Sequence, residues 1–273
     1  MQTTLAQALV WSGQKIDRID AHMLLQHVLG VDQTYLLTHS EQRLTHQQDE
    51  AFTQIVSRRV EGVPIAYLTG EREFYSLTFR VTEAVLIPRP ETELLVDLAL
   101  ARIPQNKYCR VLDLGTGSGA IALVIAKHRP KSQVIAIDFS AAAVSVANLN
   151  VQHLDVKNVQ VKQGNWFDEL SAEKFDLIVS NPPYVAEHDA HLQKGDLRFE
   201  PLLALSSGDD GLACIKHIVT NAHKYLADKA WILLEHGYDQ ATACKELLAD
   251  SGYRELCAHQ DLAGIVRVSG GRL

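Results

Sequence analysis

The residues Asn181-Pro182-Pro183-Tyr184 follow directly on the apolar segment FDLIVS at positions 175–180. Two consecutive prolines remove two backbone N–H donors and stiffen the segment, so its carbonyl oxygens stay free for a ligand. A planar NH2 group, on an amide or a nucleobase, is a poor nucleophile because its lone pair is delocalised. The Asn181 side-chain oxygen and the Pro182 carbonyl can accept its two hydrogens, and the Tyr184 ring can stack on it. We therefore predict Asn181, Pro182 and Tyr184 as catalytic residues, with Pro183 completing the substrate-binding segment.

A second group of residues is typical of a cofactor site. Three glycines, at 115, 117 and 119, lead from the strand-like segment RVLDL (110–114) into a helical pattern. Glycine suits such a turn because it adopts positive φ and lets a ligand approach the backbone closely. Asp138 ends the next strand, where an acid can accept hydrogen bonds from ribose hydroxyls. From this pattern, the candidate cofactor-binding residues are Gly115, Gly117, Gly119 and Asp138.

The glycine turn alone leaves two cofactors open. Gly115, Gly117 and Ala120 also satisfy the dinucleotide fingerprint, so an NAD site fits the pattern. Asp113, just before the first glycine, would repel a pyrophosphate but suits a cationic amino-acid ligand. S-adenosylmethionine has an ammonium and a sulfonium and no phosphate, so Asp113 favours it. Trp166 follows the third predicted strand, where its ring can pack on adenine.

The elements that must position these residues alternate along the second part of the chain. Strand-like segments lie at 110–114, 133–138, 158–163, 175–180 and 230–236, and helical patterns include 118–129 and 140–153. Strands that are apolar throughout suit a parallel sheet covered on both faces, which predicts a doubly wound, Rossmann-like α/β domain. Segments 253–258 and 264–270 are joined by a short loop, which demands antiparallel pairing and predicts one reversed edge strand.

The first part of the chain has a different pattern of apolar residues. Apolar residues recur at helical spacing around 16–28 and 51–60, with Gly30 and Gly62 as stops, which predicts a small helical bundle. Alternating residues at 77–81 and the apolar run at 84–87, closed by Pro88 and Pro90, predict a β-hairpin linker. The expected boundaries are 1–72 for the helical substrate-recognition domain, 73–90 for the hairpin and 91–273 for the catalytic domain.

The composition of the chain limits the classes of protein to which it can belong. The 273 residues carry a formal net charge of −7, and residues 1–75 hold six Lys/Arg against nine Asp/Glu, which disfavours a DNA-gripping module. The four cysteines form no close pair and no zinc spacing, so we expect reduced thiols and no metal. No signal peptide or long apolar span is visible, so we expect a cytoplasmic protein that does not bind membranes.

Several segments together match a known family. The segments are DAHMLLQHVLG (20–30), RRVEGVPIAYLTGEREFYSLTFRV (58–81), LIPRPETE (86–93), LDLGTGSGAIAL (112–123), VSNPPYV (179–185), RFEPLLAL (198–205), DGL (210–212), LLEHG (233–237) and the ending DLAGIVRVSGGR. With these the chain resembles the bacterial release factor glutamine methyltransferases over nearly its whole length. The Asn-Pro-Pro-Tyr motif is shared with adenine methyltransferases, whereas the helical domain and the PRPETE segment make the resemblance specific.

The resemblance implies a class I methyltransferase fold and S-adenosylmethionine as the cofactor, with S-adenosylhomocysteine as the product. It implies that the cofactor is contacted by Gly115, Thr116, Gly117, Ser118, Gly119, Asp138, Trp166 and Asn181. It also implies that a glutamine amide is held by Asn181 through Tyr184. The implied substrates are class I peptide release factors, modified at their Gly-Gly-Gln motif, with the helical domain helping to bind them. No direct binding of nucleic acid is expected, and Arg89 and Glu91 receive no firm role.

Three other functions remain open on sequence grounds. An adenine methyltransferase acting on nucleic acid shares the catalytic motif but needs a basic face and room for a flipped base. A related glutamine methyltransferase acts on a ribosomal protein, and its N-terminal sequence differs from the segments quoted above. A noncatalytic nucleotide-binding module would leave residues 181–184 without a role.

Overall fold

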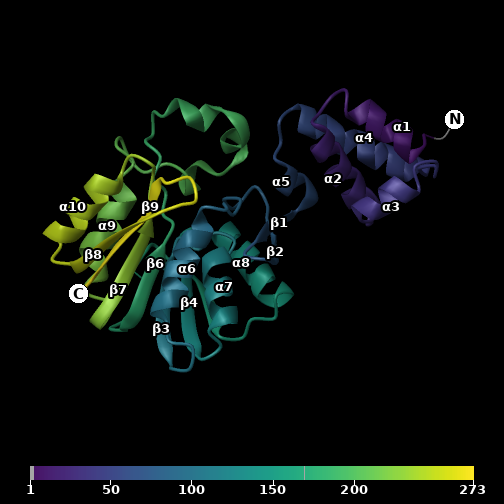
Figure 1. The fold of residues 1–273 in the computed structure, drawn as a ribbon. Helices are drawn as coiled ribbons and strands as arrows, with labels where there is room; N and C mark the ends of the chain where they lie inside the picture. The colour runs from purple at the N-terminus through teal and green to yellow at the C-terminus, as the bar shows by residue number, and fades with distance from the viewer. Residues whose placement is uncertain (1–2, 169) are drawn as a thin grey trace. The chain divides into compact units, whose positions relative to one another are not determined.

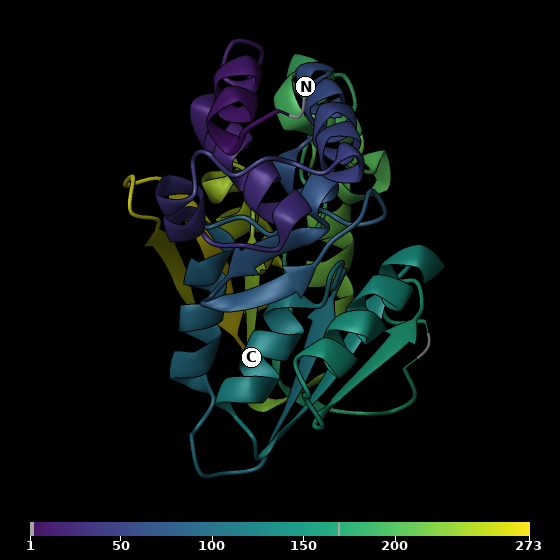
Figure 2. The same ribbon diagram turned by 90° about the vertical axis from the view of Figure 1, so that its right-hand side faces the viewer.

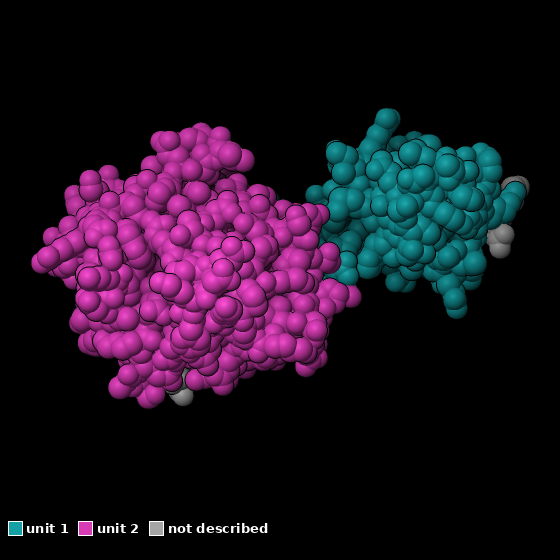
Figure 3. Space-filling view, turned by 60° about the horizontal axis from the view of Figure 1, so that its bottom comes forward, with its two compact units in different colours: residues 1–71, 195–199 teal, residues 72–194, 200–273 magenta. Residues whose placement is uncertain are grey.

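The structure is a computed structural model, which describes residues 3–168 and 170–273. The chain divides into two compact units, coloured separately in Figure 3. Unit 1 comprises Met1–Glu71 and Gly195–Phe199, and unit 2 comprises Arg72–Lys194 and Glu200–Leu273. No helix in the described part of the chain is long and apolar enough to cross a membrane.

The described residues of unit 1 form five α-helices. They are α1 (Leu5–Ser12), α2 (Arg18–Leu29), α3 (Gln33–Thr38), α4 (His46–Val60) and α5 (Ile65–Thr69). Capping boxes at Thr4 and Thr45 start α1 and α4, and Gly30 ends α2 in the left-handed conformation, as predicted. Leu24, Leu25, Phe52 and Val56 are buried. Ile19 and Met23, which belong to the predicted apolar face of α2, are instead exposed, because the buried face is centred one position further along the helix.

A β-hairpin opens unit 2, but its strands differ from the prediction. They are β1 (Glu71–Phe74) and β2 (Leu77–Arg80), and Tyr75 and Ser76 form the turn with φ of 52° and 59°. Two consecutive positive φ values are the mark of a tight hairpin turn. The predicted strand at 84–87 is wrong: Val85 closes a turn on Thr82, and the prolines beyond cannot join a strand ladder. The apolar character of this run reflects burial of Val85 and Ile87 instead.

Among the described residues, the sheet of unit 2 has seven strands in the order β5-β4-β3-β6-β7-β9-β8. Figure 1 labels all of these strands except β5. Their bounds are β3 (Cys109–Leu114), β4 (Ser132–Asp138), β5 (Val159–Gln163), β6 (Phe175–Ser180), β7 (Leu226–Glu235), β8 (Arg254–Gln260) and β9 (Val266–Arg272). The first five strands along the order are mutually parallel. Helices connect β3 to β4, β4 to β5 and β6 to β7, as the alternating sequence pattern predicts.

Helices cover both faces of this sheet (Figures 1 and 2). The helices are α6 (Thr92–Arg102), α7 (Ala120–His128), α8 (Ala141–His153), α9 (Ala213–Ala222) and α10 (Ala241–Asp250). Unit 2 also contains short 3-10 segments at Ala190–Gln193 and Leu202–Ala204, and a third 3-10 segment, Gly195–Phe199, belongs to unit 1. One core joins residues such as Val111 and Val179 to α6, α7 and the hairpin. A second core joins Leu112 and Ile178 to α9 and α10. Alternate residues of one strand thus feed two cores, which explains its continuous apolar sequence.

One strand is reversed, as expected, but its place needs a correction. β9 is the reversed strand, and it pairs antiparallel with both β7 and β8. The edge position belongs to β8, so β9 lies one strand inside the sheet rather than at its edge. The short loop between β8 and β9 required antiparallel pairing of these two strands, but it left open which of them would insert beside β7.

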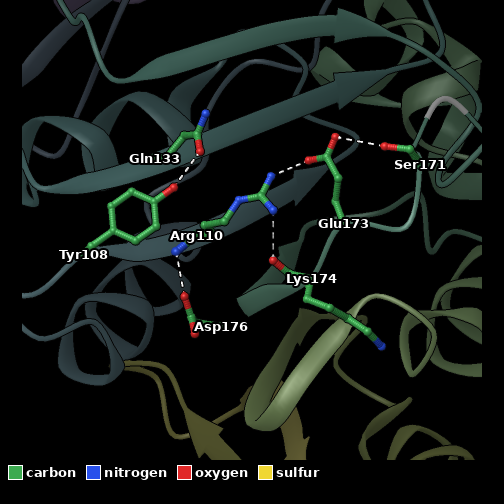
Figure 4. A network of polar contacts seen from close by, with 7 residues as sticks. All are labelled: Tyr108, Arg110, Gln133, Ser171, Glu173, Lys174 and Asp176. Atoms are coloured by element: carbon green, nitrogen blue, oxygen red, sulfur yellow. Dashed lines mark hydrogen bonds and ion pairs between the residues drawn. The ribbon is translucent and has the colours of Figure 1, made fainter.

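The amino ends of the strands are tied together at one edge of the sheet (Figure 4). The backbone N–H of Arg110 on β3 donates to the Asp176 carboxylate at 2.7 Å, and its guanidinium pairs with Glu173. Tyr108 donates to Gln133 on β4 at 2.8 Å. These contacts link the amino ends of β3, β4 and β6. The carboxyl ends of the same parallel strands lie side by side at the opposite end of the sheet.

Asn150 on α8 links that opposite edge to the hairpin. Its side chain is fully buried, accepts from the Arg80 N–H at 2.7 Å, and donates to the carbonyls of Arg80 at 2.9 Å and Ser118 at 2.8 Å. We expect Asn150→Ala to lower the free energy of unfolding by about 3 kcal/mol, because it leaves buried polar groups without partners. Urea unfolding measures this, with Asn148→Ala, an exposed asparagine of the same helix, as the control. Equal stability of the two variants would contradict the prediction.

Candidate active site

The turn between β3 and α7 adopts the conformation that its glycines predict. Gly115, Gly117 and Gly119 have φ of 71°, 57° and 83°. The N–H groups of Gly115 and Thr116 donate to the Ile137 carbonyl at 2.8 and 3.0 Å, and that of Gly119 donates to Thr116 at 2.8 Å. Side chains other than glycine rarely adopt these φ values, so the tight turn depends on glycine.

Asp138 at the end of β4 holds the same turn from the neighbouring strand. One carboxylate oxygen accepts from the Gly117 N–H at 2.8 Å and the other from the Ser140 N–H at 2.9 Å. Burial raises the pKa of this carboxyl, and the two backbone N–H groups oppose that rise. Each carboxylate oxygen has a further lone pair, so Asp138 retains acceptor capacity for a ligand.

Asp113 lies at the turn, as predicted, but its carboxylate is buried and is not available to a ligand there. Its side chain is fully buried below the turn, and the Thr116 hydroxyl donates to it at 2.6 Å. Burial raises the pKa of Asp113 to about 7. Asp113 is therefore not exposed to a ligand in the turn, and its contact with Thr116 gives it a structural role there.

One cavity of about 300 Å³ lies beside this turn, within the size range of small-molecule sites. The predicted residues that line it are Gly115, Thr116, Gly117, Ser118, Asp138, Trp166, Asn181 and Pro183. Gly119, Pro182 and Tyr184 are outside its lining. Gly119 is the N-cap of α7, and Pro182 is buried. The cavity thus brings together the two groups of residues that the sequence singled out separately.

Two aromatic rings contribute to the cavity wall. Trp166 has a φ of 53°, an unusual value for a bulky residue, and a Cβ built on Gly115 would lie 3.6 Å from its ring. Strained backbone of this kind persists where the surroundings demand it and is concentrated at functional sites. Phe139, directly after Asp138, also lines the cavity and is 60% exposed. The sequence interpretation missed Phe139, although its position after the acidic residue could have indicated it.

The segment 181–184 lies directly beside the glycine turn. Ser180 pairs with Leu114 in the sheet and its hydroxyl donates to the Leu114 carbonyl at 2.6 Å. A Cβ built on Gly115 would be 4.0 Å from the Asn181 carbonyl oxygen. Within residues 3–168 and 170–273, the carbonyls of Asn181, Pro182 and Pro183 accept no hydrogen bond. The proline pair therefore leaves free acceptors at the carboxyl end of β6, as predicted.

Behind this segment lie two residues that the sequence interpretation did not select. The Asn181 side-chain NH2 donates to the Thr92 hydroxyl at 3.1 Å, and the Tyr184 hydroxyl donates to the Glu235 carboxyl at 3.5 Å. Burial raises the pKa of Glu235 to about 7. A glutamate at the end of the apolar segment AWILLEH, next to β6 in the sheet, was the available signal.

Arg89, left without a role by the sequence, lines the cavity and pairs with Glu200 at 2.5 Å. The Glu200 side chain is fully buried, so this is a strongly desolvated ion pair. It connects the 86–93 segment to Pro201 and Leu203, which also line the cavity. Such a pair is costly to break on one side only, so it holds these two parts of the wall together.

Gly211 sets the position of Tyr184. Its φ is +73°, and a Cβ there would be 2.3 Å from the Tyr184 carbonyl oxygen and 2.8 Å from Gln240 Nε2. Gln240 donates to that same carbonyl at 2.9 Å. We expect Gly211→Ala to displace the 181–184 segment and to lower kcat on the order of 100-fold, while cofactor affinity is retained.

The matched control for Gly211 is Gly252→Ala. Gly252 has a φ of +85° but has no atom within 4 Å of a built Cβ, so it shares the backbone strain without the collision. Steady-state kinetics and cofactor titration of both variants measure the difference. A Gly211→Ala variant as active as Gly252→Ala would show that the collision is relieved without moving Tyr184.

Comparisons with known proteins find a matching family model for each of the two units. Residues 92–196 match the family model described as methyltransferase small domain, and residues 2–70 match the PrmC N-terminal domain. A crystal structure of a methyltransferase from Pyrococcus furiosus has a TM-score of 0.56 at 17% identity, covering 81% of this chain and 98% of that one. At this identity the similarity supports the fold alone.

Two curated relatives match almost end to end. The release factor glutamine methyltransferase of Escherichia coli (strain K12) is 47% identical over 93% of this chain and 92% of its own length. That of Bordetella pertussis is 48% identical over 94% of this chain and 96% of its own length. With this identity, coverage and pair of domains, the chain belongs to the release factor glutamine methyltransferase family.

Proposed function

We propose that this protein transfers a methyl group from S-adenosylmethionine to the side-chain amide nitrogen of the glutamine in the Gly-Gly-Gln motif of class I peptide release factors. The observation that carries the proposal is the position of the 181–184 segment. Its free carbonyls and the Asn181 amide stand beside the glycine turn, and Asn181 and the turn line one cavity. Membership of the family adds the class of substrate.

The turn suits S-adenosylmethionine better than a dinucleotide. A pyrophosphate needs free backbone N–H groups at the helix start. Here Gly115, Thr116 and Gly119 donate to backbone carbonyls, and Gly117 donates to Asp138. Arg89, the basic residue of the cavity lining, is already paired with Glu200. The acceptors of Asp138 and the rings of Trp166 and Phe139 remain, and these suit the ribose and adenine of a nucleoside.

The reaction needs positioning rather than a strong base. When bound, S-adenosylmethionine supplies an electrophilic methyl group on its sulfonium. The Asn181 Oδ1 and the Pro182 carbonyl accept the two hydrogens of the glutamine NH2, which aims its nitrogen at the methyl carbon. These acceptors also stabilise the positive charge that grows on nitrogen. Positioning of this kind contributes roughly 7–11 kcal/mol, and the proton leaves to water after transfer.

We further propose that unit 1 contributes to recognition of the release factor. Its match to the PrmC N-terminal domain supports this role. The acidic balance of residues 1–75 disfavours an alternative in which this part of the chain grips nucleic acid.

The test is methyl transfer from labelled S-adenosylmethionine to a purified class I release factor. We expect label on the glutamine of the Gly-Gly-Gln motif by peptide mass spectrometry, and none on a release factor with that glutamine replaced. Duplex DNA, RNA and ribosomal protein are offered in parallel. Label on nucleic acid or ribosomal protein, with none on the release factor, would overturn the proposal.

A further inference from the structure

A chain of hydrogen bonds runs behind the cavity from Asn181 to a buried acid. The Asn181 NH2 donates to Thr92 Oγ1 at 3.1 Å, and the Tyr184 hydroxyl donates to Glu235 Oε1 at 3.5 Å. Hydrogen bonding from the Thr92 side chain lowers the pKa of the Glu235 carboxyl, which links Thr92 to Glu235. Thr92 is the first residue of α6 and Glu235 the last residue of β7. Residues from three separate parts of the sequence therefore meet behind the Asn181 side chain.

The burial of this chain is costly. Thr92 is 5% exposed and Glu235 is 2% exposed. Glu235 Oε2 has no hydrogen-bond partner among the described residues. A buried acid with an unpartnered oxygen destabilises a fold relative to an apolar residue of similar size. A role in function would explain why an acid stands at this position.

The direction of the hydrogen bonds follows from the charge of Glu235. An ionised carboxylate can only accept, so the Thr92 hydroxyl must give its single hydrogen to Glu235. Thr92 Oγ1 then has only lone pairs left for Asn181, and Asn181 must turn its NH2 group toward Thr92. The opposite amide orientation would set two acceptor oxygens against each other.

We propose that Glu235 and Thr92 are positioning residues that fix the orientation of the Asn181 amide, so that its Oδ1 rather than its Nδ2 faces the substrate. This inference rests on the proposed function, because only an NH2 substrate needs an acceptor at that point. With the amide reversed, the Asn181 NH2 would meet the glutamine NH2, donor against donor. Removing the chain makes the two orientations compete, and only one of them supports transfer.

Protonation of Glu235 would remove the constraint. A protonated carboxyl can donate to Thr92, whose hydroxyl can then donate to Asn181 Oδ1 and hold the reversed amide. Burial raises the pKa of Glu235 to about 7; Glu91 at the start of α6 raises it too, while Thr92, Arg267 on β9 and Tyr184 lower it. We therefore expect kcat to rise with pH through this range, since the ionised form holds the productive orientation.

The first experiment compares Thr92→Val with Thr92→Ser. Valine has nearly the shape of threonine but no hydroxyl, whereas serine keeps the hydroxyl. We expect kcat for release factor methylation to fall several-fold in Thr92→Val, because the Asn181 amide is no longer held in one orientation, with substantial rescue in Thr92→Ser. KM for the release factor and the dissociation constant for S-adenosylmethionine should change far less. Ser132→Ala, which removes a buried hydroxyl at the start of β4, is the control.

The second experiment is the pH profile of Glu235→Gln. Glutamine keeps the shape but does not titrate, so the rise of kcat through neutral pH should disappear. A wild-type protein that leaves the release factor unmodified would contradict the proposed function. An active wild-type protein with equal kcat in Thr92→Val and Thr92→Ser, or an unchanged pH profile in Glu235→Gln, would overturn this inference alone. If Thr92→Val fails to fold, the pH profile of kcat in Glu235→Gln decides whether the inference holds.

Discussion

Asn181→Ala is expected to lower kcat for release factor methylation roughly 100- to 1,000-fold, while the protein still folds and still binds cofactor. The Asn181 side chain is the proposed acceptor for one N–H of the substrate, and that interaction strengthens as charge grows on the nitrogen. Truncation also releases Thr92 from its contact at 3.1 Å. Because the interaction belongs mainly to the transition state, the loss should appear in kcat and much less in KM.

Single-turnover methylation and a cofactor titration on the same sample separate chemistry from binding. Asn221→Ala is the matched control, because Asn221 on α9 is half-buried and outside the cavity lining, and its NH2 donates to the His217 carbonyl of its own helix. Asn221→Ala should have the wild-type rate. If Asn181→Ala turned over at the rate of this control, Asn181 would lose its role, and the Pro182 carbonyl would be the remaining candidate acceptor.

The residues that carry chemistry could be found from the sequence because their signals are local. Gly115–Gly119 sit between a strand and a helix, and 181–184 directly follow an apolar strand. In a parallel sheet the carboxyl ends of neighbouring strands meet, so alternation alone placed both groups at one edge. The pairing of Leu114 with Ser180 then brings them side by side.

Other features depend on contacts that no local pattern encodes. The ion pair of Arg89 with Glu200 joins residues 111 positions apart. The run at 84–87 is apolar because Val85 and Ile87 are buried, which a periodicity argument reads as a strand. The insertion of β9 beside β7 is a choice between two strands joined by a short loop, which allows either of them to lie beside β7. The burial of Asp113 and Glu235 could not be predicted either. A carboxyl group that faces a ligand and one that is buried behind the site look alike in sequence.

Asp138→Ala is the second change with a large expected effect, and it acts on cofactor binding. The carboxylate accepts from the Gly117 N–H at 2.8 Å and the Ser140 N–H at 2.9 Å, and it lines the cavity. Alanine removes the proposed acceptor for the ribose and also releases the glycine turn. Two hydrogen bonds from the ribose hydroxyls to the charged carboxylate would contribute about 3 kcal/mol or more to cofactor binding. The dissociation constant for S-adenosylmethionine should therefore rise at least about 100-fold.

Calorimetric titration with S-adenosylmethionine and S-adenosylhomocysteine measures this loss. Asp176→Ala is the matched control, since the Asp176 carboxylate also accepts a backbone N–H, from Arg110 at 2.7 Å, but at the opposite edge of the sheet (Figure 4). It should leave both dissociation constants unchanged. Equal affinities in the two variants would mean that Asp138 only supports the turn from within the protein. In that case the ribose must find its acceptors elsewhere in the cavity, and the assignment of the nucleoside to this end of β4 would be wrong.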